Sequence, residues 1–237
     1  MAEEALLHSV VDTLVFSEDA VKEGRAEVLA LAEEGKNHGA RLIVAGAPAF
    51  DKLTSEKAPQ GVIAVSRFME KHTSSRAVDF SEWHKGKRVL ILDHIQDPGN
   101  MGTMIRTAAA MGFDGIVTFG CTDIYSAKTL RASMGAVFRC AVYQSQDEIS
   151  DIAVLRRDGR RVLAAALGEV SLILGEAELF EDDCFIIGNE GHGISKEVLA
   201  VCDASLKIPM TNGSESLNAA AAAAMIMWEY GKHFIRP

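Results

Sequence analysis

From residue 89 onward the chain alternates short apolar runs with helix-length segments, and this alternation limits the possible folds more than any other feature. The run VLILD at residues 89–93 is apolar almost throughout, as expected for a strand buried on both faces. Further strands are predicted at residues 115–119, 138–143, 162–167, 184–188 and 204–209. Strands that alternate with helices favour an α/β fold with a mostly parallel sheet covered on both faces.

Residues 1–85 form a separate block. Its predicted elements are one helix and two strands, at residues 18–37, 41–46 and 61–65. Residues 66–87 are polar and basic with few periodic apolar positions, which indicates a linker. We therefore predict two domains, at residues 1–85 and 86–237.

The charge balance is acidic, with 24 basic and 33 acidic residues and a net charge of −9. A general basic coat that would attract nucleic acid is therefore excluded, although a local basic patch is not. Candidates for such a patch are Arg67, Lys71, Arg76, Lys85, Lys87, Arg88, Lys128 and Arg131.

Several sequence features favour a cytoplasmic protein. The longest apolar run, residues 219–228, is about half the length of a membrane-spanning helix. The acidic start lacks the basic region of a signal peptide. The four cysteines are widely spaced without a CxxC motif, which predicts reduced core residues. Seven scattered histidines show no ligand spacing, so no metal site and no membrane association are expected.

Polar, glycine-containing loops follow three of the predicted strands. They come after residues 89–93, 184–188 and 204–209. In an open parallel sheet, ligands bind at the carboxyl ends of the strands. The three loops are therefore candidates for one shared site.

The residues of the first two loops each allow a structural and a chemical interpretation. Residues 97–100 suit a turn and a helix start, and Arg106 is either an exposed side chain or a clamp for phosphate or carboxylate. Glu190 is either a charge at a helix entry or a carboxylate that orients a ligand. The surrounding GNEGHG, at residues 188–193, lacks the spacing of the dinucleotide fingerprint but allows close backbone approach to a ligand.

The third loop offers Ser214, Ser216 and Asn218, which is more small polar side chains than one helix cap requires. The chain contains neither a phosphate-binding GxxxxGK[ST] loop nor a nucleophile elbow. Spacing alone thus predicts an α/β enzyme or ligand-binding protein whose site is built from three strand-end loops.

Taken together, the loops resemble the three signature motifs of the SpoU/TrmH family of RNA ribose 2′-O-methyltransferases. The motifs are DPGNMGTMIRTAAAMGF at 97–113, GNEGHGIS at 188–195 and IPMTNGSESLNAAAAAAM at 208–225. The segment SAKTLRASMGAVF at 126–138 is similar to the family's intermediate segment.

The resemblance implies a parallel-sheet C-terminal domain with a deep trefoil knot, a feature that periodicity does not predict. Residues 1–85 are similar to the family's small α/β N-terminal domain of the ribosomal L30e type, which binds the RNA substrate. The basic opening usual for that domain is missing, so we expect a domain shortened at its front. The resemblance also implies a homodimer with part of the active site near the interface.

The resemblance further implies S-adenosylmethionine as the methyl donor, held in a bent form in the knot. Donor contacts, largely through the backbone, are expected at Gly188, Ile208, Met210 and Leu217. The implied catalytic set is Arg106, Asn100, Glu190, Ser216 and Asn218. The expected reaction is 2′-O-methylation of a ribose in RNA. Ribosomal RNA is favoured over tRNA because a separate substrate domain suits it better.

Arginine has been proposed in this family as the base for the ribose hydroxyl. The pKa of free arginine is ~12.5–13.8, so its deprotonation at pH 7 costs roughly 7–9 kcal/mol. That consumes most of the roughly 7–11 kcal/mol that proximity can return. We therefore expect Arg106 chiefly to clamp the adjacent phosphate and to stabilise developing oxyanion charge. The alternatives are a tRNA ribose methyltransferase, a relative that methylates a base, and a non-catalytic RNA-binding protein with the same fold.

Overall fold

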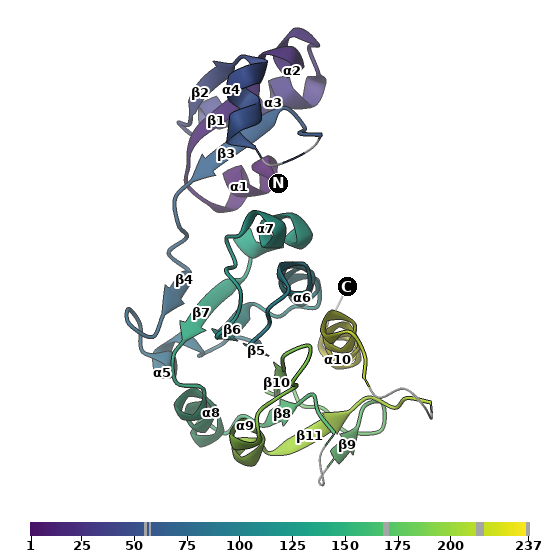
Figure 1. Cartoon of the computed structure of the whole chain (residues 1–237). Helices are drawn as coiled ribbons and strands as arrows, with labels where there is room; N and C mark the ends of the chain where they lie inside the picture. The colour runs from purple at the N-terminus through teal and green to yellow at the C-terminus, as the bar shows by residue number, and fades with distance from the viewer. Residues whose placement is uncertain (55, 57, 168–170, 212–215, 236–237) are drawn as a thin grey trace. The chain divides into compact units, whose positions relative to one another are not determined.

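The computed structural model describes residues 1–237 except 55, 57, 168–170, 212–215 and 236–237. The chain divides into two compact units, Met1–Met69 and Glu70–Pro237 (Figure 1). The predicted Ser214 lies outside the described residues. None of the helices in the described ranges is long and apolar enough to cross a membrane.

The first unit contains a three-stranded sheet with the strand order β2-β1-β3. Its strands are β1 (Val11–Ser17), β2 (Arg41–Ala45) and β3 (Val62–Ser66), with β1 parallel to β2 and antiparallel to β3. Its helices are α1 (Ala2–His8), α2 (Glu18–Lys22), α3 (Ala26–Asn37) and α4 (Ala47–Leu53). The single helix predicted at residues 18–37 is wrong. The chain turns at Gly24, whose φ of 62° is a left-handed conformation that glycine adopts without strain.

The second unit contains an eight-stranded sheet with the order β4-β7-β6-β5-β10-β8-β11-β9. The strands are β4 (His72–Ser74), β5 (Val89–Asp93), β6 (Gly115–Phe119), β7 (Ala141–Ser145), β8 (Val162–Ala164), β9 (Ser171–Ile173), β10 (Cys184–Ile187) and β11 (Ala204–Lys207). All pairings between these strands are parallel. The predicted α/β fold with a parallel sheet is therefore confirmed.

Helices cover both faces of this sheet (Figure 1). They are α5 (Phe80–Trp83), α6 (Pro98–Ala110), α7 (Ala127–Ser133), the short 3₁₀ helix η1 (Ala136–Phe138), α8 (Glu148–Arg157), α9 (Lys196–Val201) and α10 (Ala219–Phe234). Helix α6 packs on α7 and α10, whereas α8 packs on α5 and α9. Every residue of β5 is buried, which explains why this strand is apolar almost throughout.

Two expectations about the second unit are wrong. Residues 66–87 are not a linker, because β4 pairs with β7 and α5 buries Phe80 and Trp83 in the core of the second unit. A few large apolar side chains anchor this segment, too few to produce a periodic pattern. The boundary between the units therefore lies between residues 69 and 70 rather than near 85. The strand predicted at 138–143 begins only at Ala141, because η1 precedes it after Gly135, whose φ is 86°.

Candidate functional site

Side chains from all three strand-end loops meet at the carboxyl edge of the large sheet. The Asn218 Nδ2 donates a hydrogen bond to Asn100 Oδ1 at 3.1 Å. The Asn100 Nδ2 donates to Glu190 Oε1 at 3.0 Å. We call these three residues the strand-end network. The structure thus joins residues that lie 118 positions apart in the chain.

Both asparagines of the network lie at the start of a helix. The side-chain oxygen of Asn218 accepts hydrogen bonds from the backbone N–H groups of Ala220 and Ala221, which caps α10. At α6, the Asp97 carboxylate accepts from the backbone N–H of Asn100 at 2.8 Å. The hydrogen bonds that cap the two helices therefore also fix the positions of the Asn100 and Asn218 amides in the network.

Glu190 holds the loop that follows β5. Its two carboxylate oxygens accept from the backbone N–H groups of Gln96 and Asp97, both at 3.2 Å. Partial burial by itself would raise the pKa of Glu190, but hydrogen bonds from Asn100, Gln96 and Asp97 outweigh burial and lower it. Glu190 is therefore an ionised acceptor at neutral pH.

A cavity of about 470 Å³, which we call the β10 pocket, adjoins this network. All four predicted donor-contact residues line it, together with two of the predicted catalytic residues: Gly188, Ile208, Met210, Leu217, Glu190 and Ser216. The predicted residues, apart from Arg106, thus belong to this pocket or to the network that adjoins it.

The glycine at position 188 is required by close packing in the loop after β10. A Cβ at Gly188 would lie 2.5 Å from Ile194 Cγ1 and 2.6 Å from the carbonyl carbon of Gly193. The loop closes through backbone hydrogen bonds between Asn189 and Gly193, at 3.1 and 3.0 Å. Only glycine allows the loop to fold back this tightly against one wall of the pocket.

Asn189 is a structural residue that the sequence analysis did not single out. Its Nδ2 donates to the backbone carbonyl of His94 at 2.7 Å, and its Oδ1 accepts from the backbone N–H groups of Gly191 and His192. Its position inside GNEGHG could have indicated this role, because an asparagine side chain commonly hydrogen-bonds the backbone of its own turn.

Arg106 differs from the other predicted catalytic residues. It is an exposed residue of α6 and is not among the residues that line the β10 pocket. It makes no hydrogen bond or ion pair with any residue that the structure describes. Among the described residues its guanidinium thus has no partner, whereas the amides of the network are already hydrogen-bonded.

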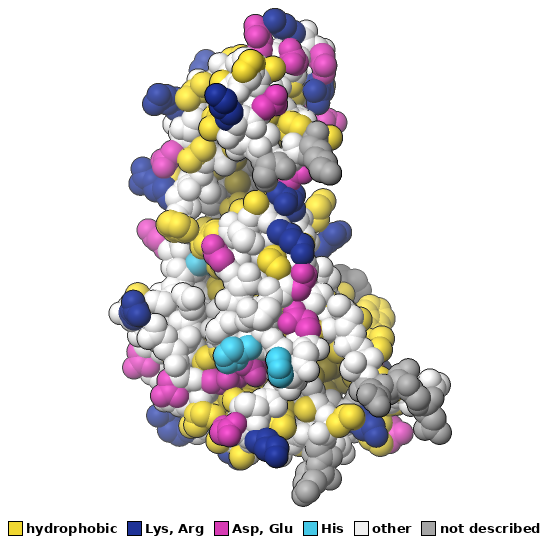
Figure 2. All heavy atoms as spheres, viewed as in Figure 1, with side chains coloured by type: hydrophobic (Ala, Val, Ile, Leu, Met, Phe, Trp, Pro, Cys, Tyr) yellow, Lys and Arg dark blue, Asp and Glu magenta, His cyan; other side chains and the backbone are white. Residues whose placement is uncertain are grey.

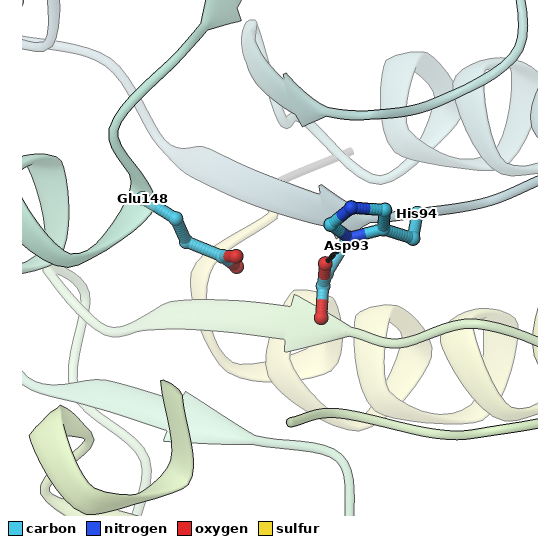
Figure 3. A group of neighbouring side chains, drawn as sticks. All are labelled: Asp93, His94 and Glu148. Atoms are coloured by element: carbon cyan, nitrogen blue, oxygen red, sulfur yellow. Dashed lines mark hydrogen bonds and ion pairs between the residues drawn. The ribbon is translucent and has the colours of Figure 1, made fainter. Parts of the chain in front are cut away.

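A cluster of three titratable side chains lies at the end of β5 and the start of α8 (Figure 3). The ligand atoms of Asp93, His94 and Glu148 lie within 4.8 Å of one another, and Asp93 shares a hydrogen bond with His94 Nδ1. Burial, followed by the charge of Asp93, raises the pKa of Glu148 to about 8. Sequence spacing could not find this cluster, because Glu148 lies far along the chain from the other two. We assign no ion to it.

The predicted basic patch is largely occupied by local partners. Within the units, the ion pairs are Arg67 with Asp12, Lys85 with Glu82, Arg88 with Glu181 and Lys128 with Asp97. Lys71 and Lys87 donate to backbone carbonyls. Figure 2 shows Lys and Arg interspersed with Asp and Glu over the visible face of the second unit. Exposed ion pairs of this kind are weak, about 0–1 kcal/mol, so phosphates can displace them.

Comparisons with known proteins agree with this geometry. The SpoU rRNA Methylase family model matches residues 87–228. The chain is 34% identical over 183 residues to the 23S rRNA (guanosine(2553)-2′-O)-methyltransferase RlmP of Bacillus subtilis, covering 76% of this chain and 68% of that protein. It is 33% identical over 149 residues to the 23S rRNA (uridine(2479)-2′-O)-methyltransferase of Streptomyces viridochromogenes, covering 59% of this chain and 50% of the relative.

The fold is similar to that of the AdoMet-bound rRNA methyltransferase from Sinorhizobium meliloti. That likeness has a TM-score of 0.81 and 27% sequence identity, and it covers 99% of this chain and 84% of the other. The matched family segment contains the strand-end network and the four predicted donor-contact residues, all of which line the β10 pocket. The chain therefore belongs to the SpoU rRNA methylase family.

Proposed function

We propose that this protein transfers a methyl group from S-adenosylmethionine to a ribose 2′-oxygen of RNA, with ribosomal RNA as its substrate. The observation that supports this most is the strand-end network beside a pocket lined by all four predicted donor-contact residues. The two relatives named above are 23S rRNA methyltransferases, which favours ribosomal RNA over tRNA.

The β10 pocket fits the donor in size and chemistry. Its volume of about 470 Å³ lies within the usual range for small-molecule sites. Leu206, Ile208 and Met210 provide apolar contacts for a purine, and backbone groups of the glycine loop are available to its polar edge. The ionised Glu190 suits a ligand that bears positive charge. When bound, S-adenosylmethionine supplies an electrophilic methyl group on a sulfonium.

The residues around the pocket divide into two roles. Asn100 and Asn218 orient the ribose, while Ser216 and Glu190 fix the loops that enclose the donor. Arg106 clamps the phosphate next to the target ribose through its planar fork and stabilises the charge that develops on the 2′-oxygen. The proton leaves late, to phosphate or water, because an arginine base would cost roughly 7–9 kcal/mol at pH 7.

The proposal includes a trefoil knot in the second unit. Strand β10 lies between β5 and β8, so the chain crosses earlier segments to reach it. After β11 the chain returns to α6, where Asn218 meets Asn100. We also propose that the first unit is an L30e-like RNA-binding domain, supported by the likeness to the Sinorhizobium meliloti structure, which extends over 99% of this chain. A cytoplasmic location is supported by the four cysteines, which are all free thiols.

A homodimer is also part of the proposal, with α10 in its interface. Met225 and Trp228 are 44% and 62% exposed on this helix. Because they lie three positions apart, they share one helical face. The change Trp228→Glu should convert a dimer into a monomer, since it would place a charge in an apolar contact. Light scattering after size-exclusion chromatography measures this. An unchanged mass would remove α10 from the interface.

The proposed reaction is tested by mapping 2′-O-methylated riboses in total RNA from cells with and without the gene. We expect one ribosomal RNA position to lose its methyl group on deletion and to regain it on complementation. A loss confined to tRNA would support the tRNA alternative. No change in either RNA class would support the non-catalytic alternative and contradict the proposal.

A further inference from the structure

A second cavity of about 470 Å³ opens at the same edge of the large sheet. We call it the β4 pocket. It is formed by strands β4, β6 and β7 and by the loop that follows β6. Its lining residues include His72, Thr118, Thr122, Asp123, Tyr125 and Gln144. None of them lines the β10 pocket or belongs to the strand-end network.

One wall of this pocket is a rigid pair of rings. His72 Nε2 lies 3.0 Å from the carbonyl oxygen of Val137 and 3.2 Å from that of Cys140. Because carbonyl oxygens only accept, Nε2 bears the hydrogen and Nδ1 accepts from the Tyr125 hydroxyl. The ring centroids are 5.4 Å apart and the planes are tilted by 49°. The wall is therefore built before any ligand arrives.

The polar groups of the pocket suit a neutral ligand rather than an anion. Neither lysine nor arginine is among its lining residues, and Asp123 contributes a carboxylate. Burial lowers the pKa of His72, so this ring is uncharged at neutral pH. Hydroxyl and amide groups of Thr118, Thr122 and Gln144 can both donate and accept hydrogen bonds. The aromatic wall, the Asp123 carboxylate and the groups that both donate and accept hydrogen bonds suit a planar, uncharged molecule with N–H groups at its edge.

The loop that forms the pocket is tied to the segment that follows β5. The backbone N–H of Thr122 donates to the carbonyl of Ile95 at 2.8 Å, and Gln96 Nε2 donates to the carbonyl of Gly120 at 2.8 Å. The backbone N–H of the same Gln96 binds Glu190. Three strand spacings separate β7 from β10, about 14 Å at about 4.8 Å each. The β4 pocket is therefore within reach of an RNA strand that occupies the network.

We propose that the β4 pocket binds an unpaired nucleobase of the RNA substrate, flanking the ribose that is methylated. The inference rests on the proposed function and adds a base-reading site to it. The base stacks on the ring of Tyr125, which His72 holds in place, and its polar edge meets Asp123 and Gln144. Holding this base fixes the register of the strand, and thereby which ribose reaches the network.

Two variants test the pocket by RNA affinity. Ala77 is exposed and lines the pocket, so the tryptophan ring of Ala77→Trp would occupy it without disturbing the core. We expect the Kd for ribosomal RNA to rise roughly tenfold or more, because stacking of one base is lost. Gln144→Ala should raise the Kd about fivefold through one lost hydrogen bond. Gln146→Ala is the matched control, since Gln146 is an exposed glutamine directly after β7 that does not line the pocket.

The measurement is filter binding of the full chain with S-adenosylhomocysteine, at one fixed salt concentration. Affinity for S-adenosylmethionine should be the same in all variants. An unchanged RNA Kd in both Ala77→Trp and Gln144→Ala overturns the inference. So does a loss of the same size in Gln146→Ala.

Photo-cross-linking with ribosomal RNA that contains 4-thiouridine and 6-thioguanosine locates the base directly. We expect a cross-linked peptide that contains Tyr125, lost in Ala77→Trp. Cross-links confined to other segments overturn the inference. These readouts need no turnover. A wild-type protein that binds RNA through this pocket but transfers no methyl group would contradict the proposed function and leave the inference standing.

Discussion

Arg106 and Asn100 of the strand-end network lie on the same helix, α6, but their side chains differ in hydrogen bonding. Asn100, Glu190 and Asn218 are hydrogen-bonded to one another and to the backbone. Arg106, six residues further along α6, has no such partner among the described residues. The hydrogen bonds of the network therefore hold loops in place, whereas we propose that the Arg106 guanidinium binds the substrate.

This difference predicts that the two groups fail in different ways when mutated. A change in the network should alter the shape of the β10 pocket and the stability of the second unit. A change at Arg106 should leave both intact and slow the reaction. The predictions below test that separation, starting with the largest expected effect.

The largest effect is expected for Arg106→Ala, which should lower kcat about 10²–10³-fold because a charge-stabilising group is removed. The affinity for S-adenosylmethionine and the thermal midpoint should not change. Steady-state kinetics and calorimetry of donor binding measure the two quantities. Arg106→Lys keeps the charge but not the planar fork, so turnover should remain low. Near-native turnover in the lysine variant would contradict the bidentate clamp.

A smaller effect is expected for Glu190→Gln. Glu190 now accepts hydrogen bonds from Gln96, Asp97 and Asn100. The amide of glutamine would turn an N–H group toward one of these donors, so that one hydrogen bond is lost. Because the carboxylate is exposed, the loss should be about 1 kcal/mol. It should appear both in the free energy of unfolding and in donor affinity, unlike the Arg106 effect. A Glu190→Gln variant with reduced kcat but normal stability and donor binding would instead indicate that Glu190 acts on the reaction, as Arg106 is expected to do.

The smallest effect is expected for Glu148→Gln. In contrast to Glu190, Glu148 has a buried Oε1 with no hydrogen-bond partner among the described residues. Burial and Asp93 hold the Glu148 proton until pH about 8, whereas its ordinary pKa is 4.5. The folded state therefore binds the proton more tightly than the unfolded state. The resulting stability is fully present below pH 4.5 and is lost as the pH rises to about 8.

Replacement by the neutral glutamine should thus leave the thermal midpoint unchanged at pH 4.5 and raise it relative to wild type above pH 8. Glu197→Gln, at an exposed position on α9, is the control and should show no such pH dependence. Equal midpoints of the Glu148 variant and the wild type above pH 8 would be inconsistent with a buried, protonated Glu148.

The sequence predicted the large sheet well because buried parallel strands are apolar on both faces, as in β5. It also predicted the meeting of three loops, because parallel strands place their carboxyl ends at one edge. It misassigned residues 66–87, since Phe80 and Trp83 anchor this segment without a repeating pattern. Spacing could not reveal the bond between Asn100 and Asn218, which only the path of the chain creates. The β4 pocket was missed for the same reason, because its ring wall joins His72 of β4 to Tyr125 in the loop after β6.

The most direct test of the account is the chemical identity of the product. Full-length protein would be incubated with methyl-labelled S-adenosylmethionine and ribosomal RNA from cells that lack the gene, and the RNA would be digested to nucleosides. The account predicts label in one 2′-O-methylnucleoside, and strongly reduced label with Arg106→Ala at saturating donor. Label in a methylated base, or equal labelling by the Arg106 variant, would contradict it.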